Sequence, residues 1–233
     1  MAQSRLRIAE IFVSIQGEGI WVGVPSVFVR VSGCNMRCTW CDTPYASWNP
    51  DGPLVSVADI LTEAARSEVG HVVLTGGEPM LFDPIVELAR ELRTTGHTIT
   101  IETAGTVYRE LDCDLMSISP KLVNSTPPED SGWRDRHEKV RLDREPLAKL
   151  MERYDCQLKF VVNPDQLGDV DEIVDLLSGL PAIAPERVLL MAEGVDSATL
   201  NRRMRELVPI CLERNWRLTP RLHVDLFGNT RGS

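Results

Sequence analysis

The sequence predicts an α/β protein whose core is an open, partial barrel of six parallel strands with helices between them. From residue 56 onward, short apolar segments rich in β-branched residues alternate with longer segments of helical period. Glycines and polar residues gather directly after the expected strands, where βα barrels build their active face. A chain of 233 residues can form one such domain with a full core, so we expect a single domain over residues 1–233.

Two strands are expected before this alternation begins. Residues 6–15 are apolar and β-branched, and residues 26–32 predict a buried strand that ends at Gly33. The segment Gln16-Gly17-Glu18-Gly19 between them is typical of a flexible turn. Arg30 interrupts the buried strand, and a charge there is costly unless it is paired. We therefore expect Arg30 either to face outward or to bind an anion.

The remaining elements follow from local signals. Ser56 and Asp59 form an expected capping box, and Asp83 with Pro84 supplies an N-cap and a first-turn proline. The segment 122–143 contains Pro127-Pro128, many charges and little periodicity, so we expect an irregular insertion. The further expected strands are 71–75, 97–102, 115–119, 157–162, 187–192 and 219–226, and the expected helices are 56–69, 84–96, 144–153, 166–178 and 197–214.

Composition excludes several classes of protein. Apolar residues make up 43% and charged residues 25% of the chain, as in an ordinary soluble protein, and the apolar runs are too short to cross a bilayer. The net charge of −9 argues against nucleic acid as a direct substrate. The N-terminal residues lack the apolar core of a signal peptide, so a reducing cytoplasm is expected, with Cys113, Cys156 and Cys211 as free thiols.

Three cysteines lie within eight residues, at Cys34, Cys38 and Cys41. Thiolates this close can converge on one soft metal centre. A structural zinc site normally has four ligands, but the next cysteine is Cys113 and the next histidine is His71. A 4Fe–4S cluster bound by three cysteines leaves one iron open for another ligand, so the odd number favours a cluster. Zinc with a distant fourth ligand, or a disulfide with a spare thiol, is the alternative.

Polar residues after the other strands also have ordinary structural interpretations. Gly76-Gly77-Glu78-Pro79 allows a close approach of backbone to a ligand, but it also suits a tight turn. Trp40 could be a core aromatic residue, and Ser119 with Lys121 could be a helix cap and a solvated lysine. Met191 could be a core residue before a turn, and His223 a surface histidine.

The cysteine spacing is that of the radical S-adenosylmethionine (SAM) enzymes, and the resemblance extends further. Residues 12–46, FVSIQGEGIWVGVPSVFVRVSGCNMRCTWCDTPYA, resemble the opening of the 7-carboxy-7-deazaguanine synthase family. The resemblance continues through TGGEP, ETAGT, SPK, KFVV and a histidine near the C-terminus. It implies an open barrel of radical SAM type in which a 4Fe–4S cluster binds SAM and cleaves it to a 5′-deoxyadenosyl radical. It also implies a Mg²⁺-dependent contraction of 6-carboxy-5,6,7,8-tetrahydropterin to 7-carboxy-7-deazaguanine, with loss of ammonia, in 7-deazapurine and queuosine synthesis.

Carried over by motif, the resemblance implies a role for each site residue. Cys34, Cys38 and Cys41 would bind the cluster, and the Thr43 hydroxyl would contact Mg²⁺ together with substrate oxygens and water. The implied SAM contacts are Trp40, Asp42, Gly77, Glu78, Ser119, Pro120, Lys121, Met191, Ala192, Glu193 and Gly194. The implied substrate contacts are Ile15, Gln16, Gly17, Glu18, Arg30, Thr75 and His223.

Two of these substrate contacts also have a direct chemical rationale. A carboxylate such as Glu18 accepts from two N–H donors, which suits the amide and amine edge of a pterin. The guanidinium of Arg30 can bind a substrate carboxylate through two parallel hydrogen bonds. In the absence of substrate, we expect Arg30 to pair with Glu18. Residues 224–233 follow His223, so the terminal-carboxylate contact of some family members is in doubt here.

The resemblance also implies partners. An electron donor such as flavodoxin or ferredoxin would reduce the cluster, and the enzyme would be a homodimer without direct contact to nucleic acid or membrane. The first alternative is a glycyl-radical enzyme activating enzyme, which is also small and has the same cysteine spacing but acts on a protein loop. The second is a non-catalytic iron–sulfur or zinc binding module. The polar set Gln16, Glu18 and Arg30 argues for a small polar substrate instead.

Overall fold

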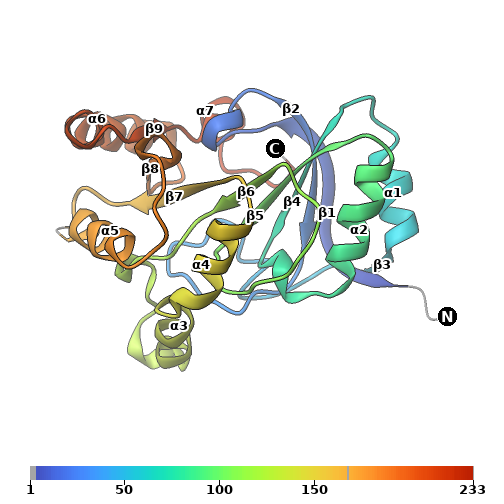
Figure 1. The fold of residues 1–233 in the computed structure, drawn as a ribbon, viewed down its shortest axis with the longest axis horizontal. Coiled ribbons are helices and arrows are strands. Elements are labelled where there is room, and N and C mark those ends of the chain that lie inside the picture. The colour runs from blue at the N-terminus through green and yellow to red at the C-terminus, as the bar shows by residue number, and fades with distance from the viewer. Residues whose placement is uncertain (1–3, 167, 233) are drawn as a thin grey trace.

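The structure is a computed structural model that describes residues 4–166 and 168–232 (Figure 1). Its described strands form one nine-stranded sheet in the order β3-β1-β2-β4-β5-β6-β7-β8-β9. The order runs from β3 at one edge to β9 at the other without closing, which confirms the predicted open barrel. The parallel part has one strand more than the six expected: β2 (Pro25–Val31), β4 (His71–Gly76), β5 (Thr98–Thr103), β6 (Leu115–Ile118), β7 (Cys156–Val162), β8 (Val188–Ala192) and β9 (Arg217–Thr219).

Two antiparallel strands extend the sheet beyond β2. The long strand β1 (Arg5–Ile15) pairs with β2, and β3 (Leu54–Ser56) pairs with β1. The parallel strands are connected mostly by helices, as right-handed crossovers require. These helices are α1 (Val57–Ala64), α2 (Pro84–Thr94), α4 (Arg144–Arg153), α5 (Asp169–Ser178) and α6 (Ser197–Arg214), with 3-10 turns at Gly19–Trp21, Pro79–Leu81, Val123–Ser125, Glu129–Ser131 and Pro185–Arg187.

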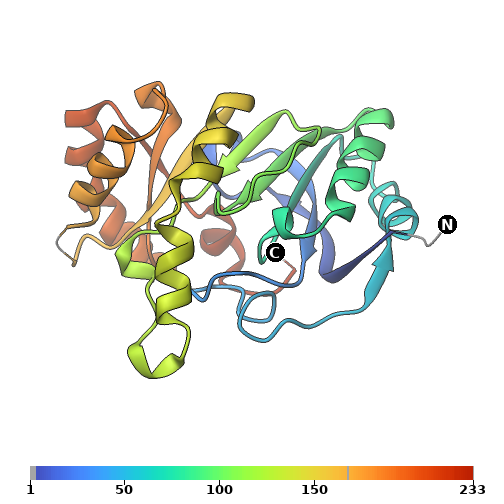
Figure 2. The ribbon, with the colours of Figure 1, turned by 60° about the horizontal axis from the view of Figure 1, so that its bottom comes forward.

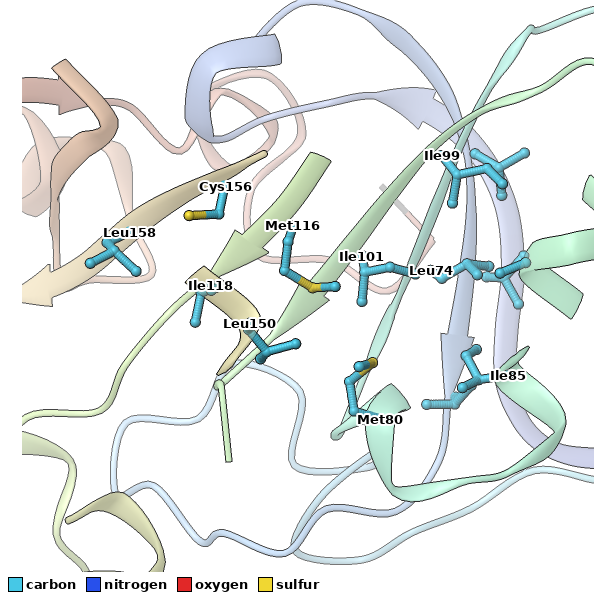
Figure 3. Close-up of a cluster of buried hydrophobic side chains, with 14 of the residues drawn as sticks. Leu74, Met80, Ile85, Ile99, Ile101, Met116, Ile118, Leu150, Cys156 and Leu158 are labelled. Carbon is cyan, nitrogen blue, oxygen red and sulfur yellow. The ribbon is translucent and has the colours of Figure 1, made fainter. Parts of the chain in front are cut away.

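The two faces of the sheet differ because side chains alternate along each strand. One face packs against the helices, and its residues Leu74, Ile101, Met116, Ile118 and Leu158 lie in the hydrophobic core (Figure 3). The intervening residues line a cavity on the other face, and several of them are polar or charged: Arg30, Thr75, Glu102, Ser117 and Lys159. The period-two pattern therefore places apolar residues under the helices and chemistry-bearing residues inside the barrel.

The segment 122–143 is not irregular throughout, because residues Arg134–Arg141 form the helix α3. Its sequence, RDRHEKVR, has no apolar period because its one buried residue is a histidine, His137. Gly132, with φ 68°, precedes it in the left-handed conformation that glycine favours. Figure 2 shows α3 projecting below the body of the protein, beside the loop that follows β2.

The expected strand over 219–226 is also wrong. The strand β9 ends at Thr219, and residues Leu222–Phe227 form the short helix α7. Pro220 explains the change, because it has no N–H to continue the sheet. The chain then turns toward the start of the protein, where the Leu222 N–H donates to the carbonyl of Gly17 at 2.9 Å.

Helix ends agree with the sequence in part. Ser56 caps α1 as predicted, since its hydroxyl accepts from the Asp59 N–H at 3.1 Å, but α1 ends at Ala64 rather than near residue 69. Asp83 precedes Pro84 at the start of α2 without a side-chain capping bond. The helix expected over 166–178 begins at Asp169, and residue 167 lies outside the described residues. None of the helices formed by the described residues is long and apolar enough to span a membrane.

Candidate active site

A cavity of about 250 Å³ occupies the inner face of the sheet. The carboxyl ends of the parallel strands, the loop after β2 and the C-terminal tail surround it. Most of the residues predicted from sequence line it: Ile15, Gln16, Gly17, Glu18, Arg30, Cys34, Cys38, Trp40, Cys41, Asp42, Thr43, Thr75, Gly77, Ser119, Lys121, Met191 and His223. Segments far apart in the sequence thus contribute to one site.

Five predicted residues do not line this cavity, and one of them, Glu193, lines a second, smaller cavity beside Trp40. Glu78 is fully buried, and its carboxylate accepts hydrogen bonds from Thr103 Oγ1 and Ala104 N–H, both at 2.8 Å. Glu193 pairs with Arg203 at 2.6 Å. Pro120 and Ala192 are buried, and the carbonyl of Gly194 accepts from Arg221 at 2.6 Å. These residues support the site but do not line the described cavity.

The three cysteines of the loop after β2 all line the cavity. Cys38 is buried and the other two are partly buried. Burial raises the pKa of the Cys34 thiol to about 12 and that of Cys38 to about 11, so thiolates at these positions need a cationic partner. Among the described residues, no group of three or more Cys, His, Asp or Glu is arranged to hold a single metal ion. A 4Fe–4S cluster, in which each thiolate binds a different iron, does not require the three thiols to meet at one ion, so it fits this loop.

The two glycines after β4 allow the backbone of that loop to pack directly against the cysteine loop. A Cβ at Gly76 would lie 2.1 Å from the Val31 carbonyl oxygen, and one at Gly77 would lie 2.1 Å from that of Gly33. The Glu78 N–H donates to the Gly33 carbonyl at 2.9 Å. The turn thus fixes the residue that precedes Cys34, and the contact of this backbone with a ligand stays a prediction.

Trp40 and Lys121 lie together on the wall beside the cysteines. The Lys121 ammonium is 5.5 Å from the centroid of the Trp40 ring and donates to Ser119 Oγ at 2.8 Å. The Trp40 ring N–H donates to Asn124 Oδ1 at 3.1 Å. The hydrogen bond holds the indole in place, so one aromatic ring, one ammonium and one hydroxyl face the cavity together.

A group of buried charges forms another part of the cavity wall. The Glu18 carboxylate pairs with Lys159 and, at 3.2 Å, with Arg221, which also pairs with Asp42. Burial alone would raise the pKa of Glu18, but the two cations outweigh it and hold this pKa well below its usual range. The Arg221 guanidinium is anchored further by the carbonyl of Gly194. Glu18 is thus an ionised acceptor at neutral pH.

Arg30 does not pair with Glu18, which corrects the expectation from sequence. Its Nε donates to Glu10 Oε1 at 2.6 Å, and the Tyr45 hydroxyl donates to the same oxygen at 2.7 Å. The antiparallel register of β1 and β2 places Glu10 opposite Arg30, whereas Glu18 lies beyond the end of β1. Arg30 is therefore a half-buried cation held at its Nε edge.

Two further predicted residues, Gln16 and Thr75, donate hydrogen bonds to Glu102. Gln16 Nε2 donates to one of its carboxylate oxygens at 3.1 Å, and Thr75 Oγ1 donates to the other at 2.8 Å. His223 lies against the turn that holds Gln16, since a Cβ at Gly17 would be 2.1 Å from its Nδ1. Gly17 is thus needed for the close packing of the C-terminal histidine.

The C-terminal tail closes one side of the cavity through residues 229–231. The Arg231 guanidinium lies 4.3 Å from the centroid of the Tyr45 ring and donates to Asp51 at 3.2 Å. The extension after His223 therefore forms part of the site. The expectation about a terminal-carboxylate contact stays a prediction, since residue 233 lies outside the described residues.

Comparison with known proteins identifies the family. The model of the Radical SAM superfamily matches residues 28–126. A 7-carboxy-7-deazaguanine synthase from Halobacterium salinarum is 45% identical over 96% of this chain and 91% of its own length. One from Rhodopirellula baltica is 44% identical over 100% of this chain and 90% of its own length. The chain belongs to the 7-carboxy-7-deazaguanine synthase family.

A solved structure agrees with this membership. The crystal structure of QueE from Escherichia coli matches with a TM-score of 0.71 at 26% identity, covering 94% of this chain and 95% of the other. The family and fold predicted from residues 12–46 and the strand–helix alternation are thereby confirmed. As a radical SAM enzyme, this family member uses a 4Fe–4S cluster and SAM, acts on a small molecule and needs a reductant. This replaces the activating-enzyme and binding-module alternatives.

Among the residues missed from the sequence are four that pair with the predicted polar groups: Glu10, Glu102, Lys159 and Arg221. Glu102 and Lys159 stand in otherwise apolar or neutral strands, TITIET and CQLKFVV. The reasoning applied to Arg30, that a charge in a buried strand needs a partner, would have found both. Glu10 and Arg221 carry no such local signal, since their roles depend on strand register and on the return of the chain after Pro220.

Proposed function

We propose that this family member catalyses the radical SAM, Mg²⁺-dependent ring contraction of 6-carboxy-5,6,7,8-tetrahydropterin to 7-carboxy-7-deazaguanine, with loss of ammonia. The observation that carries the proposal is that one cavity beside the cysteine loop presents both a carboxylate and a guanidinium to a ligand. Glu18 offers an ionised acceptor and Arg30 a guanidinium. The carboxypterin has N–H donors at one end and a carboxylate at the other, so its polarity matches that of the cavity.

The residues near the cysteine loop would bind the cofactors. Cys34, Cys38 and Cys41 would each bind one iron and leave the fourth for SAM. The bound cluster and SAM would supply the radical that abstracts hydrogen. Trp40, Ser119, Lys121 and Met191 would contact SAM from the wall, and the backbone of Gly77 would approach it closely. Asp42, Glu78, Pro120, Ala192, Glu193 and Gly194 complete the proposed SAM set, several of them by holding these loops in place.

The substrate would lie across the polar wall. Glu18 would accept from the N–H groups of the pyrimidine ring, and Gln16 with the backbone of Ile15 and Gly17 would bind the same edge. Thr75 and His223 would add hydrogen bonds. Because Glu10 binds Arg30 at Nε, the edge formed by the two terminal nitrogens is the one proposed for the substrate carboxylate.

A direct assay tests this function. Purified enzyme with a reconstituted cluster would be incubated without oxygen with the carboxypterin, SAM, Mg²⁺ and a chemical reductant. We expect 7-carboxy-7-deazaguanine and ammonia to form in equal amounts, with SAM regenerated rather than consumed. Cleavage of SAM without loss of the carboxypterin would show that the substrate assignment is wrong.

Magnesium dependence should depend on Thr43. Its hydroxyl lines the cavity and lies 3.8 Å from Cys41 Sγ, next to the cysteine loop but outside the thiol set. We expect Thr43→Ala to need about tenfold more Mg²⁺ for half-maximal activity, because Mg²⁺ demands a complete octahedron of oxygens. Iron content should stay unchanged. Thr62→Ala on the exposed face of α1 is the control, and a wild-type Mg²⁺ response in Thr43→Ala would make Thr43 a loop residue only.

Substrate affinity should depend on the shape of the Arg30 guanidinium. Arg30→Lys keeps the charge but loses the planar pair of donors, so we expect about tenfold weaker binding of the carboxypterin. SAM affinity, measured by anaerobic titration of the same sample, should not change. The exposed Arg90→Lys serves as the matched control. Equal losses of SAM and substrate affinity in Arg30→Lys would contradict the proposed carboxylate contact.

The proposed partners follow from the family and from the net charge of the chain. We propose a homodimer whose cluster is reduced by a flavodoxin or ferredoxin in the cytoplasm. The net charge of −9 supports an enzyme that makes no direct contact with nucleic acid. Sedimentation of the purified enzyme tests the dimer, and reduction of the cluster by each donor protein tests the electron source.

A further inference from the structure

The helix α3 lies beside the loop that follows β2 (Figure 2), and one buried imidazole joins the two. His137 has no exposed surface. Its Nδ1 lies 3.2 Å from the backbone nitrogen of Arg37, which stands between the first two cysteines, and its Nε2 lies 3.0 Å from Ser125 Oγ. The two partners lie on opposite sides of the ring, so His137 connects the cysteine loop to the 3-10 turn at Val123–Ser125.

The donors and acceptors of this chain fit only one protonation state. The Arg37 N–H is a donor, so Nδ1 must be the acceptor and cannot carry a proton. The Ser125 hydroxyl donates to the Leu122 carbonyl at 2.6 Å, so it accepts from Nε2–H. Burial lowers the pKa of His137 to about 4, which agrees with a neutral ring at physiological pH. Along this series of hydrogen bonds, from Arg37 through His137 and Ser125 to the Leu122 carbonyl, each polar hydrogen therefore has one acceptor.

The segment that holds Ser125 and His137 contacts the cysteine loop at two further points. The Thr39 N–H donates to the Ser125 carbonyl at 2.9 Å. The Arg37 guanidinium lies 4.0 Å from the centroid of the Trp133 ring and donates to the carbonyls of Cys34 and Met36 at 2.8 and 2.7 Å. The backbone between Cys34 and Cys38 is thus fixed from outside, by a segment that does not line the cavity.

We propose that His137 is a positioning residue for the cluster site, and that it holds the peptide of Arg37 so that the three thiols are arranged before a cluster binds. The proposal rests on the assignment of Cys34, Cys38 and Cys41 as cluster ligands. A metal site gains affinity when its ligands are held in position beforehand, and the groups that orient the ligands contribute to this. His137 orients the ligands indirectly, because it binds the backbone of Arg37 rather than a thiol.

Two substitutions test the contacts of Nδ1 and Nε2 separately. In His137→Asn the amide oxygen can take the place of Nδ1 and accept from Arg37 N–H. In His137→Gln the amide nitrogen can take the place of Nε2 and donate to Ser125, while the acceptor for Arg37 is lost. Hydrogen exchange of individual amides in the cluster-free protein reads out the difference directly. We expect about tenfold faster exchange at Arg37 in His137→Gln, near wild-type exchange there in His137→Asn, and unchanged exchange at Thr39 in both.

Cluster properties provide a second measurement. We expect the reduction potential and the electron paramagnetic resonance spectrum of the SAM-bound cluster to change in His137→Gln and to stay near wild type in His137→Asn. The partly exposed His97→Gln, on the loop before β5, is the matched control. If a His137 variant does not fold, Ser125→Ala keeps the imidazole but removes the acceptor that fixes its tautomer. Nδ1 is then no longer held as an acceptor, as the amide oxygen of His137→Asn is, so Arg37 exchange should rise.

Two results would overturn the proposal. One is wild-type exchange at Arg37 in His137→Gln together with an unchanged cluster spectrum. The other is an equal loss of Arg37 exchange protection in the Asn and Gln variants, with the same fall in melting temperature. His137 would then contribute only to packing. None of these measurements uses the pterin, so the proposed substrate can be wrong while the role of His137 holds, and the reverse is also possible.

Discussion

Replacing Cys34, Cys38 or Cys41 by alanine should abolish cleavage of SAM, whereas Cys113→Ala should leave it intact. Each of the three thiols lines the same cavity, and a cluster with only two protein ligands would be lost or would lack the open iron in its correct place. Cys113 precedes β6 at the opposite end of the barrel from the cysteine loop. It is partly buried against the core, so a small substitution there costs only some stability.

The measurement is 5′-deoxyadenosine formed under reducing, oxygen-free conditions, beside the iron content of each sample. Cys156→Ala is a second control, since Cys156 is a buried core residue at the start of β7 (Figure 3). We expect a loss of at least about a thousandfold in each of the three variants, the scale of removing an essential cofactor-binding group. Wild-type cleavage in any one of them would remove that cysteine from the cluster set.

The fold was predictable because it depends on periods that a sequence carries locally. Alternating residues in the strands assign Leu74 and Ile101 to the helix-covered face, and caps such as Ser56 mark where a helix starts. The same logic fails for α3, whose single buried residue is the polar His137. A helix that buries a hydrogen-bonded imidazole instead of an apolar stripe leaves no signal at a period of 3.6.

The site was predictable where its residues stand in contiguous motifs, and less so where they meet across the fold. Cys34, Cys38 and Cys41 stand out by their spacing, and the resemblance of residues 12–46 to a known family points to Thr43, Gln16 and Glu18. The partner of Arg30 is instead set by the pairing of β1 with β2, and the partner of Glu18 is Lys159, 141 residues later. Spacing along the chain cannot show such pairings, because they depend on which strands become neighbours.

Glu18→Gln should weaken binding of the carboxypterin by about tenfold or more, which corresponds to about 1.4 kcal/mol. One acceptor oxygen becomes an N–H₂ group that faces the donors of the substrate. SAM affinity, measured on the same sample, should stay near wild type because the cysteine loop is unchanged. Glu145→Gln on the exposed face of α4 is the matched control, since its pair with Lys149 lies in solvent.

The same substitution should also lower stability, and the effect should depend on pH. Removing the charge breaks the ion pair of the buried Lys159 and leaves the buried Arg221 with Asp42 as its other acidic partner, at a cost on the order of 3 kcal/mol. The folded-state pKa of Glu18 is depressed, so its contribution to stability is present above its ordinary pKa of 4.5 and declines as the pH falls through the folded-state value. The difference in unfolding free energy between wild type and Glu18→Gln should therefore be largest near pH 7 and shrink in acid. If this difference is constant from pH 7 to pH 3 and substrate affinity is unchanged, Glu18 is not ionised in the folded protein and does not bind the pterin.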